Sequence, residues 1–160
     1  MGYGLDGWET HGPNLEKGFK KRLENATPKD QFQLFTNLSV EITDDIQGAI
    51  DRRKPLTAMY VGGMGSEKNN YHRDSMSRRG FPEAAIQIQK CWLDGDKEGA
   101  TKAVPDEYID QGGLIGPVKR IRERFSSVIP KGATGLIIRS EEIQTITLMA
   151  EIVEEHFGLH

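Results

Sequence analysis

The sequence predicts an α/β fold with parallel strands, in which this chain forms part of a larger barrel. Two strand–helix units support the fold class: residues 32–40 are typical of a strand before a helix, and residues 136–138 of a strand before the closing helix. Two strands are too few for a parallel sheet that helices cover on both faces. Either further strands escape detection, or the chain is a truncated piece of a barrel, which is the interpretation we favour.

Composition and charge favour a globular protein without a nucleic-acid partner. Hydrophobic residues make up 36% of the 160 residues, charged residues make up 28%, and the net charge is −3. Binding to a phosphate backbone needs a clustered basic field, whereas the basic run at residues 119–124 also contains a glutamate. We interpret that run as the solvated face of a helix.

Neither a metal site nor a membrane segment is predicted. The single cysteine, Cys91, excludes an internal disulfide, and no Cys/His cluster has metal-ligand spacing. No apolar run approaches the roughly 20 residues that span a membrane. The N-terminus lacks the basic and apolar regions of a signal peptide. We therefore expect a cytoplasmic protein with no membrane partner.

The N-terminal part is expected to hold one helix and one strand. Residues 1–13 are rich in glycine, and Asn14 is placed to cap a helix that ends near Glu24. Residues 32–40 then alternate between two faces. The mainly apolar face carries Leu34, Thr36, Leu38 and Val40, and the other carries Phe35, Asn37 and Ser39. A barrel strand has this character, because helices cover its outside while its polar end lies near a ligand.

A helical tract is expected between the two strands. Thr43 is placed to cap a helix that begins with two aspartates, and Pro55 interrupts it. Apolar spacing then predicts short helices over 70–79, 82–93, 97–104 and 107–111, each ended by a glycine or a proline. The last of them ends at Gly112 and Gly113, and Pro117 starts the next helix.

The C-terminal unit consists of the strand at residues 136–138 and a long helix. Ser140 is placed to cap this helix, and Gly158 to end it. Its expected buried stripe consists of Ile143, Ile146, Met149, Ala150, Val153 and Phe157.

A glycine-rich stretch at residues 60–72 is the most distinctive local feature. One hypothesis is a cradle for a phosphate or polyglutamate group, formed by Gly62, Gly63 and Gly65 with Lys68 as counter-charge. The alternative, which we favour, is a glycine turn between packed helices. No strand precedes the glycines and the G-x-x-x-x-G-K-[ST] spacing is missing, so the stretch is not a P-loop.

Four stretches together resemble the luciferase-like monooxygenases, in particular their coenzyme F420-dependent oxidoreductases. Residues 5–8 (LDGW) are similar to an "ADGW" motif at the end of the sixth strand in that family. The other three are residues 58–65 (AMYVGGMG) with the following lysine, asparagine and tyrosine, residues 104–107 (VPDE) with 116–124 (GPVKRIRER), and residues 132–138 (GATGLII). They resemble "LYVGGMG…KNFY", "VPDE…GPPERVRERL" and the eighth strand.

The resemblance implies the C-terminal part of a TIM (α/β)8 barrel, with one domain over residues 1–160. Residues 32–40 then correspond to the seventh strand, 136–139 to the eighth, and roughly 55–115 to a helical insertion between them. The implied activity is hydride transfer between F420, or FMN as the alternative, and a small organic substrate. Activity would need the absent N-terminal barrel half. The alternative is a non-catalytic remnant or interaction domain of the same fold, and a homo-oligomer is a further alternative.

Active sites of such barrels lie at the mouth formed by the carboxyl ends of the strands. The residues that the resemblance places at this mouth are Trp8, His11, Glu41, Thr43, Arg139 and Ser140. Candidates for contact with cofactor or substrate are Trp8, Asn37, Gly62, Gly63, Lys68 and Arg139. His11 is a weak candidate for a proton donor, since its ordinary pKa of about 6.5 suits neutral pH. A structural role for this loop histidine is the alternative, and the catalytic residues stay unassigned.

Overall fold

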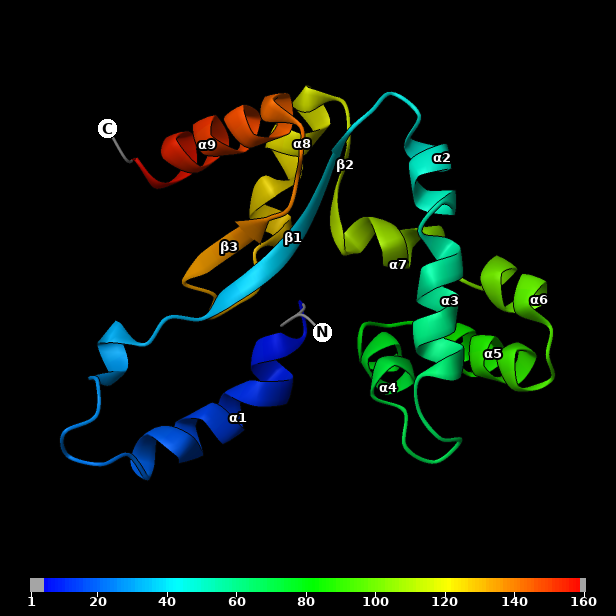
Figure 1. Ribbon diagram of the computed structural model, residues 1–160, viewed down its shortest axis with the longest axis horizontal. Helices are drawn as coiled ribbons and strands as arrows, with labels where there is room; N and C mark the ends of the chain where they lie inside the picture. Colours follow the sequence, from blue (N-terminus) through cyan, green and yellow to red (C-terminus); the bar gives the residue numbers. More distant parts are fainter. Residues whose placement is uncertain (1–4, 159–160) are drawn as a thin grey trace.

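The computed structural model describes residues 5–158, whose centre is a parallel sheet of three strands. The strands are β1 (Phe35–Ile42), β2 (Gly113–Gly116) and β3 (Gly135–Ile138), in the spatial order β2-β1-β3 (Figure 1). β3 pairs with the first half of β1, with Phe35 opposite Gly135. β2 pairs with the second half on the other edge, with Ser39 opposite Gly113.

Helices surround this sheet unequally. Six of them form a helical lobe between β1 and β2: α2 (Ile46–Asp51), α3 (Lys54–Gly63), α4 (Tyr71–Arg78), α5 (Pro82–Leu93), α6 (Lys97–Lys102) and α7 (Asp106–Gln111). α8 (Val118–Arg124), the 3-10 turn η2 (Phe125–Val128) and α9 (Ile143–Phe157) lie on the other side of the sheet (Figure 1). α1 (Gly7–Lys20) and the 3-10 turn η1 (Lys29–Gln31) precede β1.

Alternation along β1 separates a covered face from an open one, as the sequence predicts. Thr36 and Leu38 are buried on the face under α8 and α9, whereas Phe35, Asn37 and Ser39 are exposed. Phe35 is 50% exposed, and Ile137, which lies opposite Asn37 on β3, is 41% exposed. Phe35 and Ile137 therefore form an apolar surface that residues 5–158 leave uncovered, although burying such side chains is favourable.

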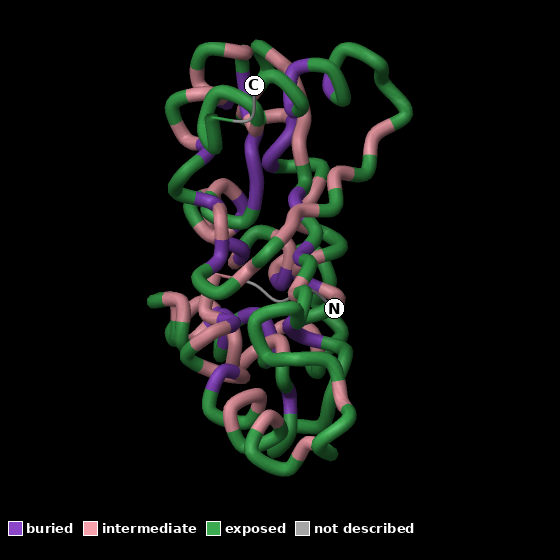
Figure 2. The backbone as a smooth tube through the Cα atoms, turned by 90° about the vertical axis from the view of Figure 1, so that its left-hand side faces the viewer, coloured by how far each residue is buried: buried purple, intermediate pink, exposed green. Residues whose placement is uncertain are grey.

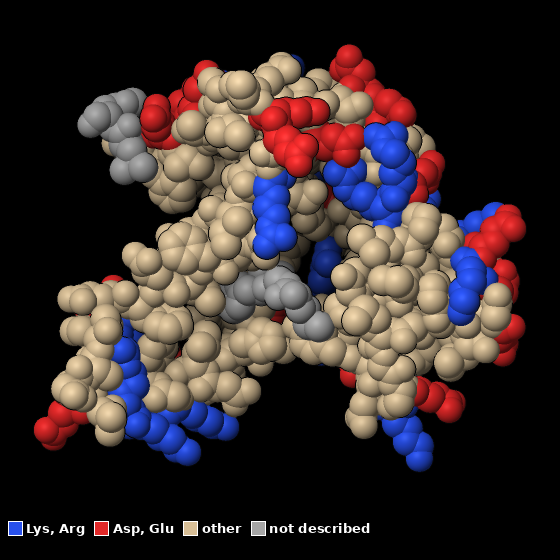
Figure 3. Space-filling model, in the orientation of Figure 1, with Lys and Arg blue, Asp and Glu red and all other residues tan. Residues whose placement is uncertain are grey.

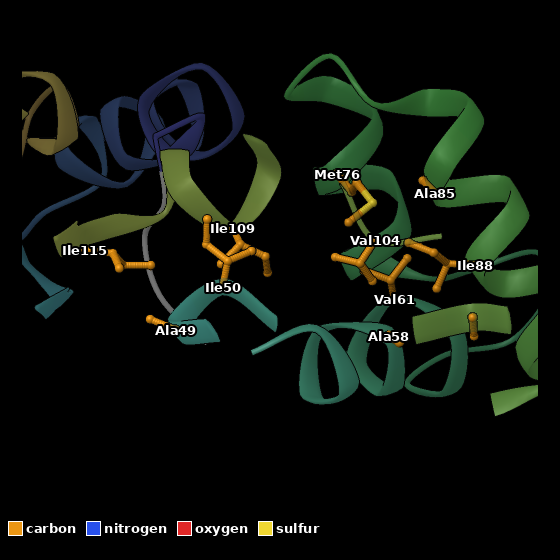
Figure 4. Close-up of a cluster of buried hydrophobic side chains, with 11 residues drawn as sticks. Ala49, Ile50, Ala58, Val61, Met76, Ala85, Ile88, Val104, Ile109 and Ile115 are labelled. Carbon is orange, nitrogen blue, oxygen red and sulfur yellow. The ribbon is translucent and has the colours of Figure 1, made fainter. Parts of the chain in front are cut away.

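Two hydrophobic cores share β2 as their common wall. Leu114 packs into the sheet core with residues of β1, α8, η2 and α9. The next residue, Ile115, points the opposite way into the core of the helical lobe (Figure 4). Figure 2 shows buried segments in the interior of the chain and exposed residues on most outer turns. Because successive residues of a strand face opposite sides, four residues are enough to join sheet and lobe.

The strand β2 is absent from the sequence-based expectation, which ends the preceding helix at Gly112 and Gly113 and continues the helical insertion to about residue 115. All four residues of β2 are buried, so it lacks the alternation of apolar and polar residues that marks a half-buried strand. The helical tract itself spans residues 46–111. The insertion as a unit, with its expected limits, stays a prediction.

Three of the expected helix caps are wrong. α1 begins at Gly7 rather than after Asn14, because Asp6 anchors its first turn to Thr10, Ser75 and Arg78. α2 is capped by Asp45, whose Oδ1 accepts from the Gly48 N–H at 2.9 Å, and not by Thr43.

Ser140 does not cap the C-terminal helix α9, because the cap position is Glu142, two residues further on. The Ser140 hydroxyl instead accepts a hydrogen bond from the N–H of Glu142, in a turn that precedes the helix.

The buried stripe expected for α9 is also largely wrong. The buried residues are Thr145, Leu148, Met149 and Ile152, of which only Met149 belongs to the expected stripe. Ile143 is 80% exposed and Ile146 is 51% exposed. A cavity of about 800 Å³ lies between β3 and the second apolar face of α9, including Ala150, Val153 and Phe157. The helix thus has two apolar faces, and only one is covered by residues 5–158.

The glycines of the 60–72 stretch allow two helices to approach closely. Gly62 and Gly63 form the last turn of α3 and lie against Trp92 of α5. A Cβ on Gly62 would overlap the Cβ of Trp92, and one on Gly63 would lie 2.5 Å from Trp92 Nε1. Asn70 then caps α4 and donates to the Val61 carbonyl oxygen at 2.6 Å. These contacts support the interpretation as a helix-packing turn.

A carboxylate at the end of β1 holds α2 against the sheet. Glu41 accepts from Arg52 Nη2 at 2.6 Å and from Arg53 Nη2 at 2.7 Å. Partial burial raises the pKa of Glu41, but the hydrogen bonds and charges of the two arginines outweigh it and hold this pKa below its ordinary value.

Replacing Gly62 by alanine is expected to lower the free energy of unfolding by about 1–3 kcal/mol, because the new methyl group forces α3 away from Trp92. Gly18 in α1 is the matched control, since no atom lies within 4 Å of its Cβ position. Gly18→Ala should raise the free energy by about 0.5–1 kcal/mol through backbone entropy. Urea unfolding followed by circular dichroism measures both; equal effects would contradict the packing role.

Replacing Glu41 by glutamine is expected to lower the free energy of unfolding at pH 7 by at most about 1 kcal/mol. A lowered folded-state pKa means that this stabilisation is present above the unfolded pKa, about 4.3 for glutamate, and is lost as the pH falls through the folded value. The difference between wild type and Glu41→Gln should therefore shrink below about pH 4.3. The exposed neighbour Asp44 provides the control Asp44→Asn, and a difference that grows on acidification would contradict the ion pair.

Candidate functional site

A cavity of about 410 Å³ opens where β1 and β2 meet the helical lobe. Its walls come from β1, β2, α3 and α7, from the turn between α2 and α3, and from the residue that follows α4. The lining residues are Ser39, Arg52, Arg53, Leu56, Thr57, Tyr60, Arg79, Tyr108, Ile109, Gly112, Gly113 and Ile115. Figure 3 shows basic side chains at and inside a hollow between the strands and the lobe. We call this cavity, with its three arginines, the arginine cavity.

Strand geometry determines the position of the arginine cavity. Ser39 belongs to the open face of β1 and lies in the second half of the strand, opposite Gly113. A Cβ on Gly113 would lie 2.8 Å from the Ser39 carbonyl oxygen, so glycine allows the close approach of β2 here. Both strands run parallel, and ligand sites of parallel α/β folds lie beyond the carboxyl ends of the strands. The arginine cavity lies instead beside the middle of β1, at Ser39, and beside the amino end of β2, at Gly113.

The charges in the arginine cavity are unequally paired. Arg52 and Arg53 share the carboxylate of Glu41, and Arg53 also donates to the Ala49 carbonyl oxygen at 2.7 Å. Arg79 forms no ion pair within residues 5–158. Asp45 also lies 3.9 Å from Arg52 Nη1. Three guanidinium groups against two carboxylates still leave a positive charge in the cavity, which suits an anionic group.

Arg79 is held by Tyr108 of α7. Its Nη2 donates to the Tyr108 carbonyl oxygen at 3.1 Å, and its guanidinium lies 4.1 Å from the centre of the Tyr108 ring. Burial raises the pKa of the Tyr108 hydroxyl, although the charge of Arg79 opposes that rise. The Arg79 Nε is buried and has no hydrogen-bond partner.

A second cavity, of about 600 Å³, reaches Arg79 from the side of α1. It is lined by Leu5, Asp6, Glu9, Thr10, Arg78, Arg79 and Gln111. Asp6 accepts from Arg78 Nε at 3.2 Å and so ties the start of α1 to α4. The "LDGW" motif therefore lies beside the arginine cavity, with Arg79 lining both cavities.

Trp8 and His11 lie on α1, outside the arginine cavity. Trp8 packs over Gly12, where an added Cβ would be 3.1 Å from its ring. His11 Nε2 lies 3.1 Å from the Tyr71 hydroxyl oxygen. His11 lines a further cavity of about 630 Å³ with Phe19 and others. The structure thus separates His11 from the arginine cavity and gives it a tyrosine partner.

The other sequence-predicted candidates are scattered. Asn37 is exposed on the open face of β1, in the same row as Ser39. Arg139 is exposed just after β3, and Lys68 is exposed in the loop between α3 and α4. Gly62 and Gly63 lie against Trp92. None of these candidates lines the arginine cavity, although Asn37 shares the open face of β1 with Ser39, which does.

Most of the arginine cavity escapes sequence-based reasoning. Its polar residues lie on short helices or at their ends, where they have the character of ordinary solvated surface. They are Arg52, Arg53, Tyr60, Arg79 and Tyr108. The pairs Arg52-Arg53 and Arg78-Arg79 are the signals that could have indicated it, because adjacent arginines at a helix end often bind anions or helix carbonyls.

Two kinds of site are not found within residues 5–158. None of the helices there is long and apolar enough to cross a membrane. No group of three or more histidine, cysteine, aspartate or glutamate side chains in that part of the chain is arranged to hold a metal ion.

Comparison with known proteins identifies the family. The profile described as "Luciferase-like monooxygenase" matches residues 4–134, which is most of the chain. A protein of Mycobacterium tuberculosis named "Putative coenzyme F420-dependent oxidoreductase" is 28% identical over 139 residues. That match covers 87% of this chain but 40% of the relative, so the chain spans less than half of the relative's length. With its parallel strands and helical lobe, the chain belongs to the luciferase-like monooxygenase family, and it is similar to the F420-dependent type.

Proposed function

We propose that this chain is the C-terminal part of an oxidoreductase that transfers a hydride between a deazaflavin, coenzyme F420, and a small organic substrate. FMN is the alternative cofactor. The observation that supports this most is the arginine cavity, a positively charged hollow where the open face of β1 meets the lobe. The name of the mycobacterial relative supports the choice of F420 over FMN.

The residues present fit a part of such a cofactor. A cavity of about 410 Å³ is within the range that small-molecule sites occupy, but it is small for a ring system together with an anionic tail. The arginines suit the anionic portion, while exposed Phe35 and Ile137 on the neighbouring open face offer apolar surface to a planar ring. The bound cofactor would accept or donate the hydride.

The chain's own residues would bind and orient the cofactor and the substrate rather than perform the redox step. Ser39 and Asn37 offer hydroxyl and amide groups along one row of β1. Arg79, fixed against Tyr108, would hold the anionic end. His11 keeps its place as a weak candidate for a proton donor at the α1 side, although Tyr71 is its partner in this structure.

The remaining strands of the barrel are proposed to come from another segment, which would cover the open face. Two apolar surfaces support this: the row with Phe35 and Ile137, and the groove between β3 and α9. The coverage of 40% of the relative agrees with a missing portion. A second copy of the chain is the alternative cover, and a non-catalytic domain is the alternative role.

Titration of the 160-residue chain with F420 should give weak, saturable binding, with a dissociation constant above about 1 μM, because most of the cofactor site lies on the absent strands. Backbone amide resonances that shift in NMR spectra should cluster around Ser39, Asn37 and Tyr108. Ser39→Phe, which narrows the arginine cavity, should abolish the shifts. Ser126→Phe is the matched control at an exposed position of η2.

Three outcomes of this titration would contradict the proposal. Submicromolar binding to this chain alone would show that the absent strands contribute little to the cofactor site. Shifts confined to the groove between β3 and α9 would place the ligand elsewhere. Equal affinity for F420 and FMN would remove the support for a deazaflavin, and an absence of shifts with both would favour a non-catalytic domain.

A further inference from the structure

The buried Nε of Arg79 is an unexplained feature of the arginine cavity. Among the buried side-chain nitrogen and oxygen atoms of residues 5–158, it is the one without a hydrogen-bond partner. A buried donor of a charged group that lacks a partner destabilises the folded state. Native structures rarely keep such a donor unless a ligand, ion or water satisfies it.

Tyr108 contacts part of the Arg79 guanidinium, while Nε is buried without a partner. The Tyr108 ring covers one face of the group at 4.1 Å, and the Tyr108 carbonyl oxygen takes one hydrogen of Nη2 at 3.1 Å. The neighbour Arg78 is neutralised by Asp6, but no carboxylate of residues 5–158 pairs with Arg79. Stacking on a tyrosine therefore fixes the plane of the guanidinium while its charge stays uncompensated.

Arg52 and Arg53 differ from Arg79 in this respect. Both bind the carboxylate of Glu41, so their charges are already compensated in part. They lie on the wall of the same cavity and add positive potential there. Their charges would attract an anionic ligand, whereas Arg79 has a buried Nε–H donor without a hydrogen-bond partner.

We propose that Arg79 is the anchor of an oxyanion subsite, in which Nε and one Nη donate side by side to two oxygens of a phosphate or carboxylate group. Paired donation of this kind is the geometry for which arginine is suited and lysine is not. Arg79 lines both the arginine cavity and the cavity beside α1, so the anion can belong to a ligand that enters from either. This inference deepens the proposed function by assigning the end of the cofactor or substrate that the chain holds.

The test follows the side-chain Nε–H resonances of the 160-residue chain by two-dimensional NMR during titration with inorganic phosphate and, separately, with glutarate. One arginine Nε–H signal should move downfield and saturate, and it should be missing from the spectrum of Arg79→Lys. The anion that saturates at the lower concentration identifies the group as phosphate or carboxylate. Arg79→Gln should weaken binding of that anion about ten- to a hundredfold.

Matched controls separate this effect from a general loss of positive charge. Arg22→Gln removes the same charge just after α1, where Arg22 lies against Phe19 and outside the arginine cavity. It should change affinity by less than about twofold, because salt screens distant charges. Thermal unfolding without ligand verifies that each variant folds, and Arg79→Lys, which keeps the charge, should still lose most of the affinity because it lacks the paired donors.

The proposal is overturned if the anions shift no arginine Nε–H signal, if the shifting signal persists in Arg79→Lys, or if Arg22→Gln weakens binding as much as Arg79→Gln. Failure of the proposed function is distinguishable from these results. In that case phosphate or glutarate would still bind at Arg79 while F420 would not shift the amides around Ser39.

Discussion

The position of the arginine cavity depends on the strand β2, whose four residues are all buried. Leu114 contributes to the sheet core and Ile115 to the lobe core, so two otherwise separate hydrophobic clusters are held in one orientation. Ion pairs add to this connection: Asp110 at the end of α7 accepts hydrogen bonds from Arg120 and Arg124 of α8. Arg120 also donates to the Ile115 carbonyl oxygen. The helices before and after β2 are thereby tied to the strand and to each other.

The arginine cavity is a consequence of that connection. α7 leads directly into β2, and it carries Tyr108, whose ring packs edge-on against Phe81 and stacks under Arg79. Because Gly113 lets β2 approach Ser39 closely, Tyr108 and Arg79 are brought beside the middle of β1. Ser39, Arg79 and Tyr108 converge there although they are far apart in the sequence. Nothing in the polarity of Arg79 or Tyr108 indicates this convergence, because each has the character of a helix surface residue.

The sequence predicts the elements better than it predicts how they meet. The α/β class, the alternation along β1 and the helices of the lobe follow from periodicity and from glycine and proline positions, which are local properties. β2 is missed because a fully buried strand of four residues has no period to detect. The stripe on α9 is misplaced because this helix is apolar on two sides and the sequence does not say which one finds a partner. Among the predicted site residues, Asn37 lies on the open face of β1 and Arg139 directly follows β3, whereas Gly62 and Gly63 have a packing role in the structure.

The pairing of β1 with β3 also has a consequence for the order of folding. Leu34 and Thr134, which begin this pairing, are hydrogen-bonded although 100 residues separate them. Closing so long a loop in an unfolded chain costs entropy before any contact compensates for it, and contacts of this kind slow folding. The helical lobe forms from neighbouring helices within that loop, so its early formation would shorten the effective distance between the strands. The lobe would then act as a folding nucleus for the sheet as well as a wall of the cavity.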